Sequence, residues 1–312
     1  MSESGSARVW PRISLVTPNY NYGHFIEATI RSVLDQDYAN LEYIVLDDGS
    51  TDDSVETIRR YANRLAHWET GANRGQYATI TQGFARCTGE IFGWLNSDDM
   101  HLPWTLRAVG DIFAHFPEID WITSLHPGHW DRAGFLERFS RSMGFSLAAF
   151  LDGRNLPPAA LLPRSVPSRN RELIQQESTF WRRSLWEKAG GNASQDFGSA
   201  GDFELWARFF RQAELIGIGI PLAGFRHQDQ QQTVQAEKYA RWCEKALAAY
   251  RDEVRWQPDS LRSAAHFVRS LPIPQPYAAP GLRAFGYTGR RVVRRDSSSA
   301  DARWELEDYR FL

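Results

Sequence analysis

Three acidic segments have the residue types and spacing for chemistry. Asp47-Asp48 and Asp98-Asp99 directly follow apolar runs typical of strands, and Gly201-Asp202-Phe203-Glu204 precedes a helical pattern. In open parallel sheets, ligands bind beyond the carboxyl ends of strands, so the first two pairs should meet at one sheet edge. An isolated Asp pair is also compatible with a helix cap or a solvated turn. Adjacent carboxylates repel each other unless neutralised, and their hard oxygens favour Mg²⁺ or Mn²⁺.

The elements that would position these acids alternate between strand and helix patterns. Short apolar runs with β-branched residues predict buried strands, and apolar residues at helical spacing predict the intervening helices. The predicted strands are 13–17, 41–46, 67–69, 91–95 and 119–123, and the predicted helices are 25–34, 55–62, 76–85 and 104–116. We expect Gly89 to close the third of these helices as a C-cap. The alternation predicts an α/β fold with a doubly wound, mostly parallel sheet.

The second half of the chain has weaker patterns. Residues 126–175 are rich in Pro, Arg and Ser and predict loops around one helix at 145–151. Further helices are predicted at 180–189, 203–213 and 234–255. Beyond Pro258 we expect peripheral helices and a loosely held tail, with Ser297-Ser298-Ser299 as a flexible link.

Composition excludes several classes of protein. The net charge of -2 over 312 residues gives no global basic field for nucleic acid. The two cysteines, Cys87 and Cys243, lie far apart and predict reduced, buried thiols in a cytosolic protein. Residues 1–12 carry no apolar segment typical of a secretory signal, and no apolar run approaches the ~20 residues of a membrane span. We expect a cytoplasmic protein, soluble or peripheral at the inner face of the plasma membrane.

One dense basic run stands near the end of the chain, at Arg290-Arg291-Val292-Val293-Arg294-Arg295. A solvated surface accounts for it. A peripheral contact with anionic lipid is the alternative, since each basic residue near a bilayer contributes about 1 kcal/mol.

The acid pairs lie within sequence blocks that resemble family 2 glycosyltransferases. The blocks are VTPNYN at 16–21, IRSVLDQ at 30–36, VLDDGSTD at 45–52, NRGQ at 73–76, GEI at 89–91 and LNSDD at 95–99. The resemblance is strong over 13–125 and resumes at ESTFWRR (177–183), Gly190-Gly191 and GDFELW (201–206). It implies a GT-A fold, a nucleotide-sugar donor, a divalent metal and inversion at the anomeric carbon.

The resemblance also implies roles on the donor side. Pro18 and Tyr20 match positions that flank the nucleotide base, where the tyrosine ring can stack on a pyrimidine. Asp48 matches the acid that accepts a hydrogen bond from the base or ribose, and Arg74 would lie near the base or phosphates. The structural alternatives are a strand-ending turn or a helix cap for Pro18, Tyr20 and Asp48, and a solvated surface position for Arg74.

The loop at 96–99 carries the implied donor and metal contacts. Asp98 resembles the carboxylate on the ribose or donor sugar, and Asp99 resembles the direct metal ligand. Ser97 stands where many relatives carry an acid or another small residue, which leaves one fewer potential carboxylate for the metal. His227 lies in a late block where a histidine can reach the metal or diphosphate, although a core or surface histidine is an equal alternative.

Inversion requires a base for the acceptor hydroxyl, and Asp202 matches the family's catalytic acid residue. The structural alternative is a capping carboxylate at a helix N-terminus, which would keep a low pKa. Gln176, Glu177 and Trp181 are expected on the acceptor side, with a core position as the alternative for Trp181.

The sequence therefore predicts an inverting glycosyltransferase that moves a sugar, UDP-linked by the family's default, to a hydroxyl of a glycan or lipid-linked acceptor in surface-polysaccharide assembly. The expected organisation is a tail (1–12), a nucleotide-sugar-binding half (13–125), an acceptor-binding and catalytic half (126–233) and a helical extension with its tail (234–312). A non-catalytic nucleotide- or carbohydrate-binding protein is one alternative, which would not require Asp202. A sugar nucleotidyltransferase is another, but it needs a glycine-rich basic loop where this chain has Pro18-Asn19-Tyr20-Asn21.

Overall fold

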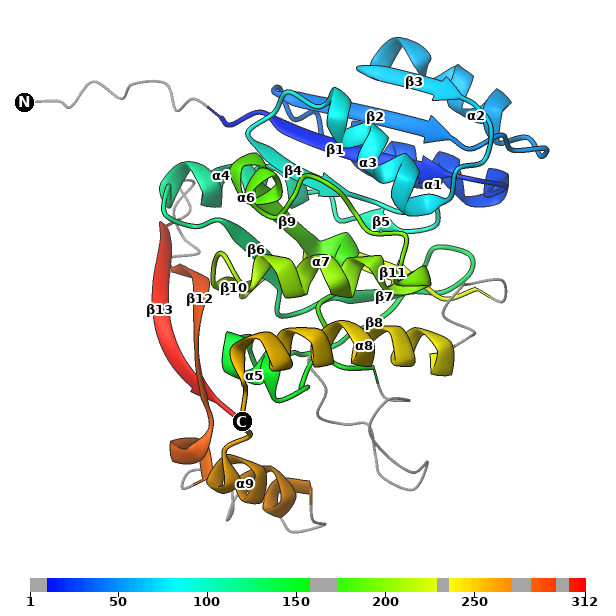
Figure 1. The fold of residues 1–312 in the computed structure, drawn as a ribbon. Helices are drawn as coiled ribbons and strands as arrows, with labels where there is room; N and C mark the ends of the chain where they lie inside the picture. Colours follow the sequence, from blue (N-terminus) through cyan, green and yellow to red (C-terminus); the bar gives the residue numbers. More distant parts are fainter. Residues whose placement is uncertain (1–9, 158–172, 229–235, 271–281, 296–302) are drawn as a thin grey trace, which may run out of the picture.

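The computed structural model describes residues 10–157, 173–228, 236–270, 282–295 and 303–312. A large sheet runs through the molecule, with the strand order β13-β12-β10-β6-β9-β4-β1-β2-β3 (Figure 1). Its strands are β1 (Ile13–Asn19), β2 (Leu41–Asp47), β3 (His67–Thr70), β4 (Ile91–Trp94), β6 (Trp121–Ser124), β9 (Thr179–Arg182), β10 (Leu215–Ile218), β12 (Tyr287–Arg295) and β13 (Arg303–Phe311). Most neighbouring pairs are parallel, and only β9 and β13 run antiparallel to their neighbours. The predicted halves 13–125 and 126–233 both contribute strands to this one sheet.

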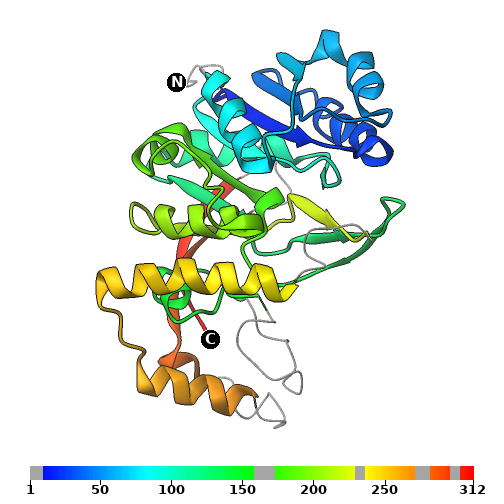
Figure 2. The same cartoon turned by 45° about the vertical axis from the view of Figure 1, so that its right-hand side comes forward.

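Helices cover both faces of the sheet. One buried cluster joins the sheet to α1 (Gly23–Leu34), α2 (Ser54–Arg60) and α4 (Thr105–His115). The other joins it to α3 (Gln76–Arg86), α6 (Arg183–Lys188) and α7 (Gly201–Phe209). Outside α7 lie α5 (Leu147–Leu151), α8 (Ala236–Val254) and α9 (Ser260–Ser270), at the end of the molecule opposite β3 (Figures 1 and 2). The doubly wound architecture predicted from the alternating patterns is confirmed.

An aromatic core fills the space between the sheet and α7. Trp94 and Trp206 stack with ring centroids 5.9 Å apart, and Trp181 meets both rings edge-on. Because Trp181 is fully buried, it contributes packing and not an acceptor contact. The core alternative for this residue is therefore the correct one.

A smaller sheet lies beside the carboxyl ends of the central strands. It consists of β5 (Met100–His101), β11 (Ala223–Arg226), β7 (Gly128–Trp130) and β8 (Leu136–Phe139), in the order β5-β11-β7-β8. Since β5 directly follows the 96–99 loop and β11 directly precedes His227, this sheet brings two distant segments together. Its strands have two to four residues each, too few to give a periodic signal in the sequence.

Two local predictions were wrong. The helix expected at 180–189 begins only at Arg183, because Thr179–Arg182 forms β9 between β4 and β6 in the middle of the sheet. A short buried run fits a strand or a helix equally well by periodicity. Gly89 does not cap α3, which ends at Arg86; instead, a side chain at position 89 would collide with the main chain of Arg12.

The chain end is also different from the expected helical extension and loose tail. The helices α8 and α9 are followed by a β12–β13 hairpin that forms the edge of the large sheet. The basic run lies in β12, where Arg290, Arg291 and Arg295 form ion pairs with acids of β13. The expected link at 297–299 lies outside the described residues. Among those that the structure describes, no helix is long and apolar enough to cross a membrane.

Candidate active site

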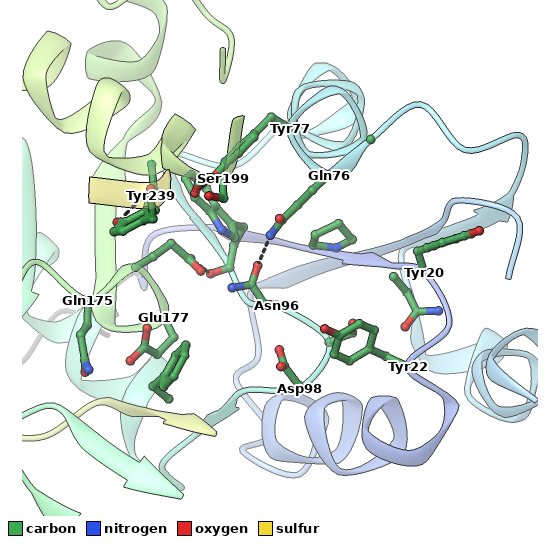
Figure 3. A pocket seen from close by; sticks show the side chains of 18 of the residues that line it. Tyr20, Tyr22, Gln76, Tyr77, Asn96, Asp98, Gln175, Glu177, Ser199 and Tyr239 are labelled. Carbon is green, nitrogen blue, oxygen red and sulfur yellow. Dashed lines mark hydrogen bonds between the residues drawn. The ribbon is translucent and has the colours of Figure 1, made fainter. Parts of the chain in front are cut away.

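A cavity of about 600 Å³ opens beyond the carboxyl ends of β1, β2 and β4 (Figure 3). It brings together six of the eight residues predicted to act in donor binding, metal binding or catalysis: Pro18, Tyr20, Asp48, Asp98, Asp202 and His227. The other two, Arg74 and Asp99, do not line it. The two acid pairs thus converge at one edge of the sheet, as parallel strand ends require.

One end of the cavity is formed by the turns after β1 and β2. Tyr20 is 46% exposed and lies at this end (Figure 3). Asp47 is occupied by the turn itself, since its carboxylate accepts hydrogen bonds from Asn19 Nδ2 (2.8 Å) and Thr70 Oγ1 (2.7 Å). Asp48 lines the cavity, while its Oδ2 accepts from the backbone N–H of Gly75 at 3.1 Å. The Asp47 carboxylate thus stabilises the turn, and the Asp48 carboxylate is the one of the pair that can contact a ligand in the cavity.

Arg74 lies outside this cavity. Its guanidinium contacts the side chain of Gln82 and lines a shallow groove with residues 192–196. Its backbone N–H lies 3.3 Å from Asp48 Oδ2. Arg74 therefore contributes its main chain, and not its guanidinium, to the surroundings of Asp48.

The loop at 96–99 is held from several sides. Asn96 Oδ1 accepts a hydrogen bond from Gln76 Nε2 at 2.8 Å (Figure 3), and Thr29 Oγ1 lies 2.8 Å from the carbonyl oxygen of Asp99. Asp98 faces the cavity, where its Oδ2 accepts from Gln228 Nε2 at 3.1 Å. The loop therefore presents the Asp98 carboxylate on a rigid support.

Asp99 has opposite surroundings. It is 1% exposed, and its Oδ1 accepts a hydrogen bond from the backbone N–H of Arg226 at 2.9 Å. Burial, together with the charges of Asp98 and Glu177, raises the pKa of Asp99 well above its usual value. This carboxyl ties the loop to β11 and does not face the space where a donor would bind.

Asp202 stands in the first turn of α7 beside Tyr239, which lies on the side of the cavity away from Tyr20 (Figure 3). Its Oδ1 accepts from the backbone N–H of Phe203 at 2.8 Å, and the hydroxyl of Tyr239 lies 3.4 Å from Oδ2. Burial raises the pKa of Asp202 to about 6. The raised pKa differs from the low pKa that the capping alternative implies, because the loss of solvent outweighs the helix N-terminus.

Glu177 was expected on the acceptor side of the site. In the structure it is a buried carboxyl group close enough to Asp98 and Asp202 to be affected by their charges. It is 3% exposed and points into the same space as Asp98 (Figure 3). Burial, assisted by the charges of Asp202 and Asp98, raises the pKa of Glu177 to about 8. Among the described residues, its Oε1 has no hydrogen-bond partner, and neither have the Oε1 atoms of Gln175 and Gln176.

These unpartnered atoms belong to three consecutive residues that all line the cavity. Leaving a buried polar atom unsatisfied costs about 1–3 kcal/mol, so such a row requires an explanation. A ligand that carries several hydroxyl groups would supply the missing partners.

His129 was not identified from the sequence. Its Nδ1 lies 3.0 Å from His227 Nε2, its Nε2 lies 2.5 Å from Ser140 Oγ, and the two imidazole rings stack. Burial lowers the pKa of His129 to about 4, with the charges of Arg138 and His227 adding to the effect. His129 therefore stays neutral near pH 7 and supports the exposed His227 ring. No motif marks it, because it lies in the stretch predicted as loops.

The charge of the lining is one-sided. Among the described residues it contains four carboxyl groups (Asp48, Asp98, Glu177 and Asp202) and neither lysine nor arginine. In that part of the chain, no group of three or more His, Cys, Asp or Glu residues could hold a metal ion by itself. Mg²⁺ is commonly held by one or two carboxylates with substrate phosphates as the other ligands, and this lining fits that arrangement.

Comparisons with known proteins agree with this geometry. Residues 14–121 match the family model described as glycosyl transferase family 2. An uncharacterized glycosyltransferase of Nostoc sp. is 34% identical over 105 residues, which cover 33% of this chain and only 33% of that relative. An uncharacterized glycosyltransferase of Mycobacterium tuberculosis is 28% identical over 218 residues, covering 69% of this chain and 75% of the relative.

Solved structures share the fold at low sequence identity. S. aureus TarS 1–349 in complex with UDP-GlcNAc has a TM-score of 0.56 and 15% identity, over 88% of this chain and 71% of that one. The mannosyltransferase PcManGT from Pyrobaculum calidifontis, in complex with GDP-Man and Mn²⁺, has a TM-score of 0.55 and 18% identity, over 89% and 74%. Glucosyl-3-phosphoglycerate synthase from Mycobacterium tuberculosis, in complex with Mn²⁺, UDP and phosphoglyceric acid, has a TM-score of 0.51 and 18% identity, over 80% of each chain.

Proposed function

We propose that this chain, which has the GT-A fold of its structural neighbours, is a family 2 glycosyltransferase and transfers a sugar from a UDP-sugar to an acceptor hydroxyl with inversion. The observation that carries this proposal is the convergence of Asp48, Asp98 and Asp202 in one cavity. These residues come from three separate sequence blocks and from the ends of different elements. UDP is the favoured nucleotide because TarS and glucosyl-3-phosphoglycerate synthase bind it in their structures.

The donor nucleotide would enter at the end formed by Pro18, Tyr20 and Asp48. The exposed Tyr20 ring offers a flat face for stacking on a base, and such stacking contributes about 0.5–1.5 kcal/mol beyond burial. Asp48 is held by the Gly75 N–H and can accept a hydrogen bond from an imide or hydroxyl group. The transferred sugar then lies toward the unpartnered amide and carboxyl oxygens of residues 175–177, which suit its hydroxyl groups.

A divalent cation, Mg²⁺ or Mn²⁺, would neutralise the diphosphate as it leaves and is held, in this proposal, chiefly by Asp98. Asp98 lines the cavity, whereas the Asp99 carboxylate is buried against Arg226. This reverses the roles that the sequence resemblance implied for the two residues. His227 remains a proposed ligand of the metal or diphosphate, with its ring oriented by His129.

Asp202 is the proposed base. Its carboxylate takes the proton of the acceptor hydroxyl while the hydroxyl oxygen attacks the anomeric carbon from the side opposite the diphosphate. The bond between the anomeric carbon and the diphosphate oxygen breaks, and the diphosphate leaves with the electron pair. A pKa of about 6 leaves Asp202 ionised at neutral pH yet basic enough to accept a proton in the transition state.

The alternatives from the sequence are less well supported. A non-catalytic binding protein does not need a buried carboxylate with a raised pKa at the acceptor end of the cavity. A sugar nucleotidyltransferase needs basic residues around the phosphates, and the described lining has no lysine or arginine.

Membrane contact through the basic run also stays a prediction. Three of its arginines are paired with β13 acids, which lowers the positive charge available to lipid headgroups. The acceptor itself, a glycan or a lipid-linked saccharide, is likewise part of the proposal.

The test compares Asp202→Asn with Glu204→Gln in a turnover assay with UDP-sugars and Mn²⁺. Glu204 is a matched control because it lies in the same helical turn but forms an ion pair with Arg208 at 2.8 Å. Loss of a general base should lower turnover about 10²–10⁴-fold in the Asn variant, with donor binding retained. The Gln variant should stay near wild type, and undiminished turnover in Asp202→Asn would remove the proposed base.

A further inference from the structure

A second pocket, of about 210 Å³, lies where the C-terminal hairpin meets the segments after β6 and β10. Its lining residues are Leu125, His126, Arg141, Ser142, Met143, Gly219, Arg291, Tyr309, Arg310 and Phe311. It shares no lining residue with the active-site cavity. Because one water takes about 30 Å³, the pocket has room for a ligand of several heavy atoms.

The charge of this pocket is opposite to that of the active site. Its described lining holds three arginines and one histidine and contains no carboxyl group. Arg291 is paired with Glu307 and lies over the Tyr309 ring, and Arg310 donates to the carbonyl of Ala284. Within the described part of the chain, Arg141 has no hydrogen bond or ion pair.

The side chain of His126 is affected by the charges of two of these arginines. Burial lowers the pKa of His126, and the guanidinium groups of Arg141 and Arg291 lower it further. The two arginines come from distant parts of the sequence and line the same pocket as His126. A guanidinium presents a planar fork of N–H donors that matches the oxygen atoms of phosphate.

From these observations we propose that the pocket binds a phosphate group, held by Arg141 with Arg291 and Arg310. The group is either part of the acceptor or a free phosphate ion, and both use the same contacts. The acceptor-borne case rests on the proposed function, whereas phosphate binding itself does not.

The β7–β8 segment connects this pocket to the active site. His126 lines the pocket and His129 lines the cavity, so their Cα atoms lie within about 10 Å at the ~3.4 Å rise of extended chain. Directly after β8 (Leu136–Phe139), Ser140 contacts His129, and the next residue is Arg141. In the acceptor-borne case, the acceptor hydroxyl lies near Asp202 and its phosphate group lies in this pocket.

The test is a calorimetric titration with inorganic phosphate in EDTA and at low ionic strength. Without a metal, the acid-lined cavity repels phosphate, so binding there does not interfere. We expect saturable binding by the wild type and an affinity at least about tenfold lower for Arg141→Gln, which removes charge-assisted hydrogen bonds. Arg310→Gln should also weaken binding and serves as a second, independent variant.

The matched control is Arg294→Gln, which removes one positive charge from the same hairpin outside the pocket. This variant should bind phosphate like the wild type. No saturable binding, or equal weakening by Arg294→Gln and Arg141→Gln, overturns the proposal. Because the titration needs neither donor nor turnover, its failure is distinguishable from failure of the proposed glycosyltransferase reaction.

The source of the phosphate follows from turnover assays with added phosphate. If the acceptor carries the group, phosphate competes with the acceptor and leaves hydrolysis of the donor alone unchanged. If a free ion is the ligand, phosphate changes donor hydrolysis in the absence of acceptor, and Arg141→Gln removes that effect. Phosphate that alters neither rate contradicts a connection between pocket and active site.

Discussion

At the residue scale, the loop after β4 places two neighbouring carboxyl groups in opposite surroundings. Asp98 faces a cavity without lysine or arginine in its described lining, and Asp99 is buried against the Arg226 backbone. A cation in the cavity should therefore depend on Asp98. Asn at position 99 keeps an oxygen for the Arg226 N–H and resembles the neutral carboxyl that burial favours.

We predict that Asp98→Asn weakens Mn²⁺-dependent UDP binding at least roughly tenfold, whereas Asp99→Asn keeps it within about threefold. Calorimetry with UDP at fixed Mn²⁺ measures both values. The opposite order, with Asp99→Asn the more damaging, would restore the roles implied by the sequence resemblance.

Glu177 gives a second residue-scale prediction. Its folded-state pKa of about 8 lies above the unfolded value, so the folded protein binds the extra proton and loses stability as pH rises toward 8. Glu177→Gln removes this loss. We compare the free energy of unfolding of the variant with that of the wild type, in EDTA, at pH 5 and at pH 9. The difference in favour of the variant should be at least roughly 1 kcal/mol larger at pH 9 than at pH 5. Chemical denaturation at the two pH values measures the difference, and a difference independent of pH would contradict the assigned surroundings of Glu177.

The sequence indicated most of the residues that line the cavity but not their orientations. Pro18, Asp48 and Asp98 were indicated by motif blocks at strand ends, and Asp202 by its motif block at the start of a helix. The choice between Asp98 and Asp99 was not, since adjacent residues in a turn face different sides only once the β11 backbone is in place. Likewise, His129 enters the site through pairing of β7 with β11, a contact between residues far apart in the chain.

At the element scale, the predicted strands and helices of residues 13–124 have counterparts in the structure, because their periodic patterns are long enough to distinguish the two. The missed elements are short or lie far from their partners in sequence. β9 is a four-residue strand inserted between β4 and β6, and β12–β13 completes the sheet edge after two helices. Pairings of this kind depend on tertiary contacts and leave no local pattern.

The hairpin supplies an element-scale prediction. Trp304 on β13 is 5% exposed and donates from its indole N–H to Asp111 Oδ2 on α4 at 2.7 Å. Trp304→Ala should lower the free energy of unfolding by about 3–5 kcal/mol, because the buried indole packing and its hydrogen bond to Asp111 are both lost. The control is Phe135→Ala, at a residue 73% exposed, which should change stability by less than about 0.5 kcal/mol. Urea denaturation compares them, and equal effects would mean that the hairpin is not anchored at Trp304.

At the scale of the whole molecule, two pockets of opposite charge are connected by the β7–β8 segment. The larger one collects acids from the ends of β2 and β4 and from α7, and the smaller one collects arginines from the hairpin and the segment after β8. The acid-lined cavity should bind an anionic donor only when a cation accompanies it. Donor binding that depends on a divalent metal is therefore the central expectation of the proposed glycosyltransferase function.

The most direct measurement is thermal unfolding against a panel of nucleotide sugars, each with Mn²⁺ and with EDTA. We expect at least one UDP-sugar to stabilise the protein with Mn²⁺, by about 2.7 kcal/mol at 100 times its dissociation constant, and to have no effect in EDTA. The same UDP-sugar should fail to stabilise Asp98→Asn at that concentration. Stabilisation by no nucleotide sugar, or equal stabilisation in Mn²⁺ and EDTA, would contradict the proposed metal-dependent donor site.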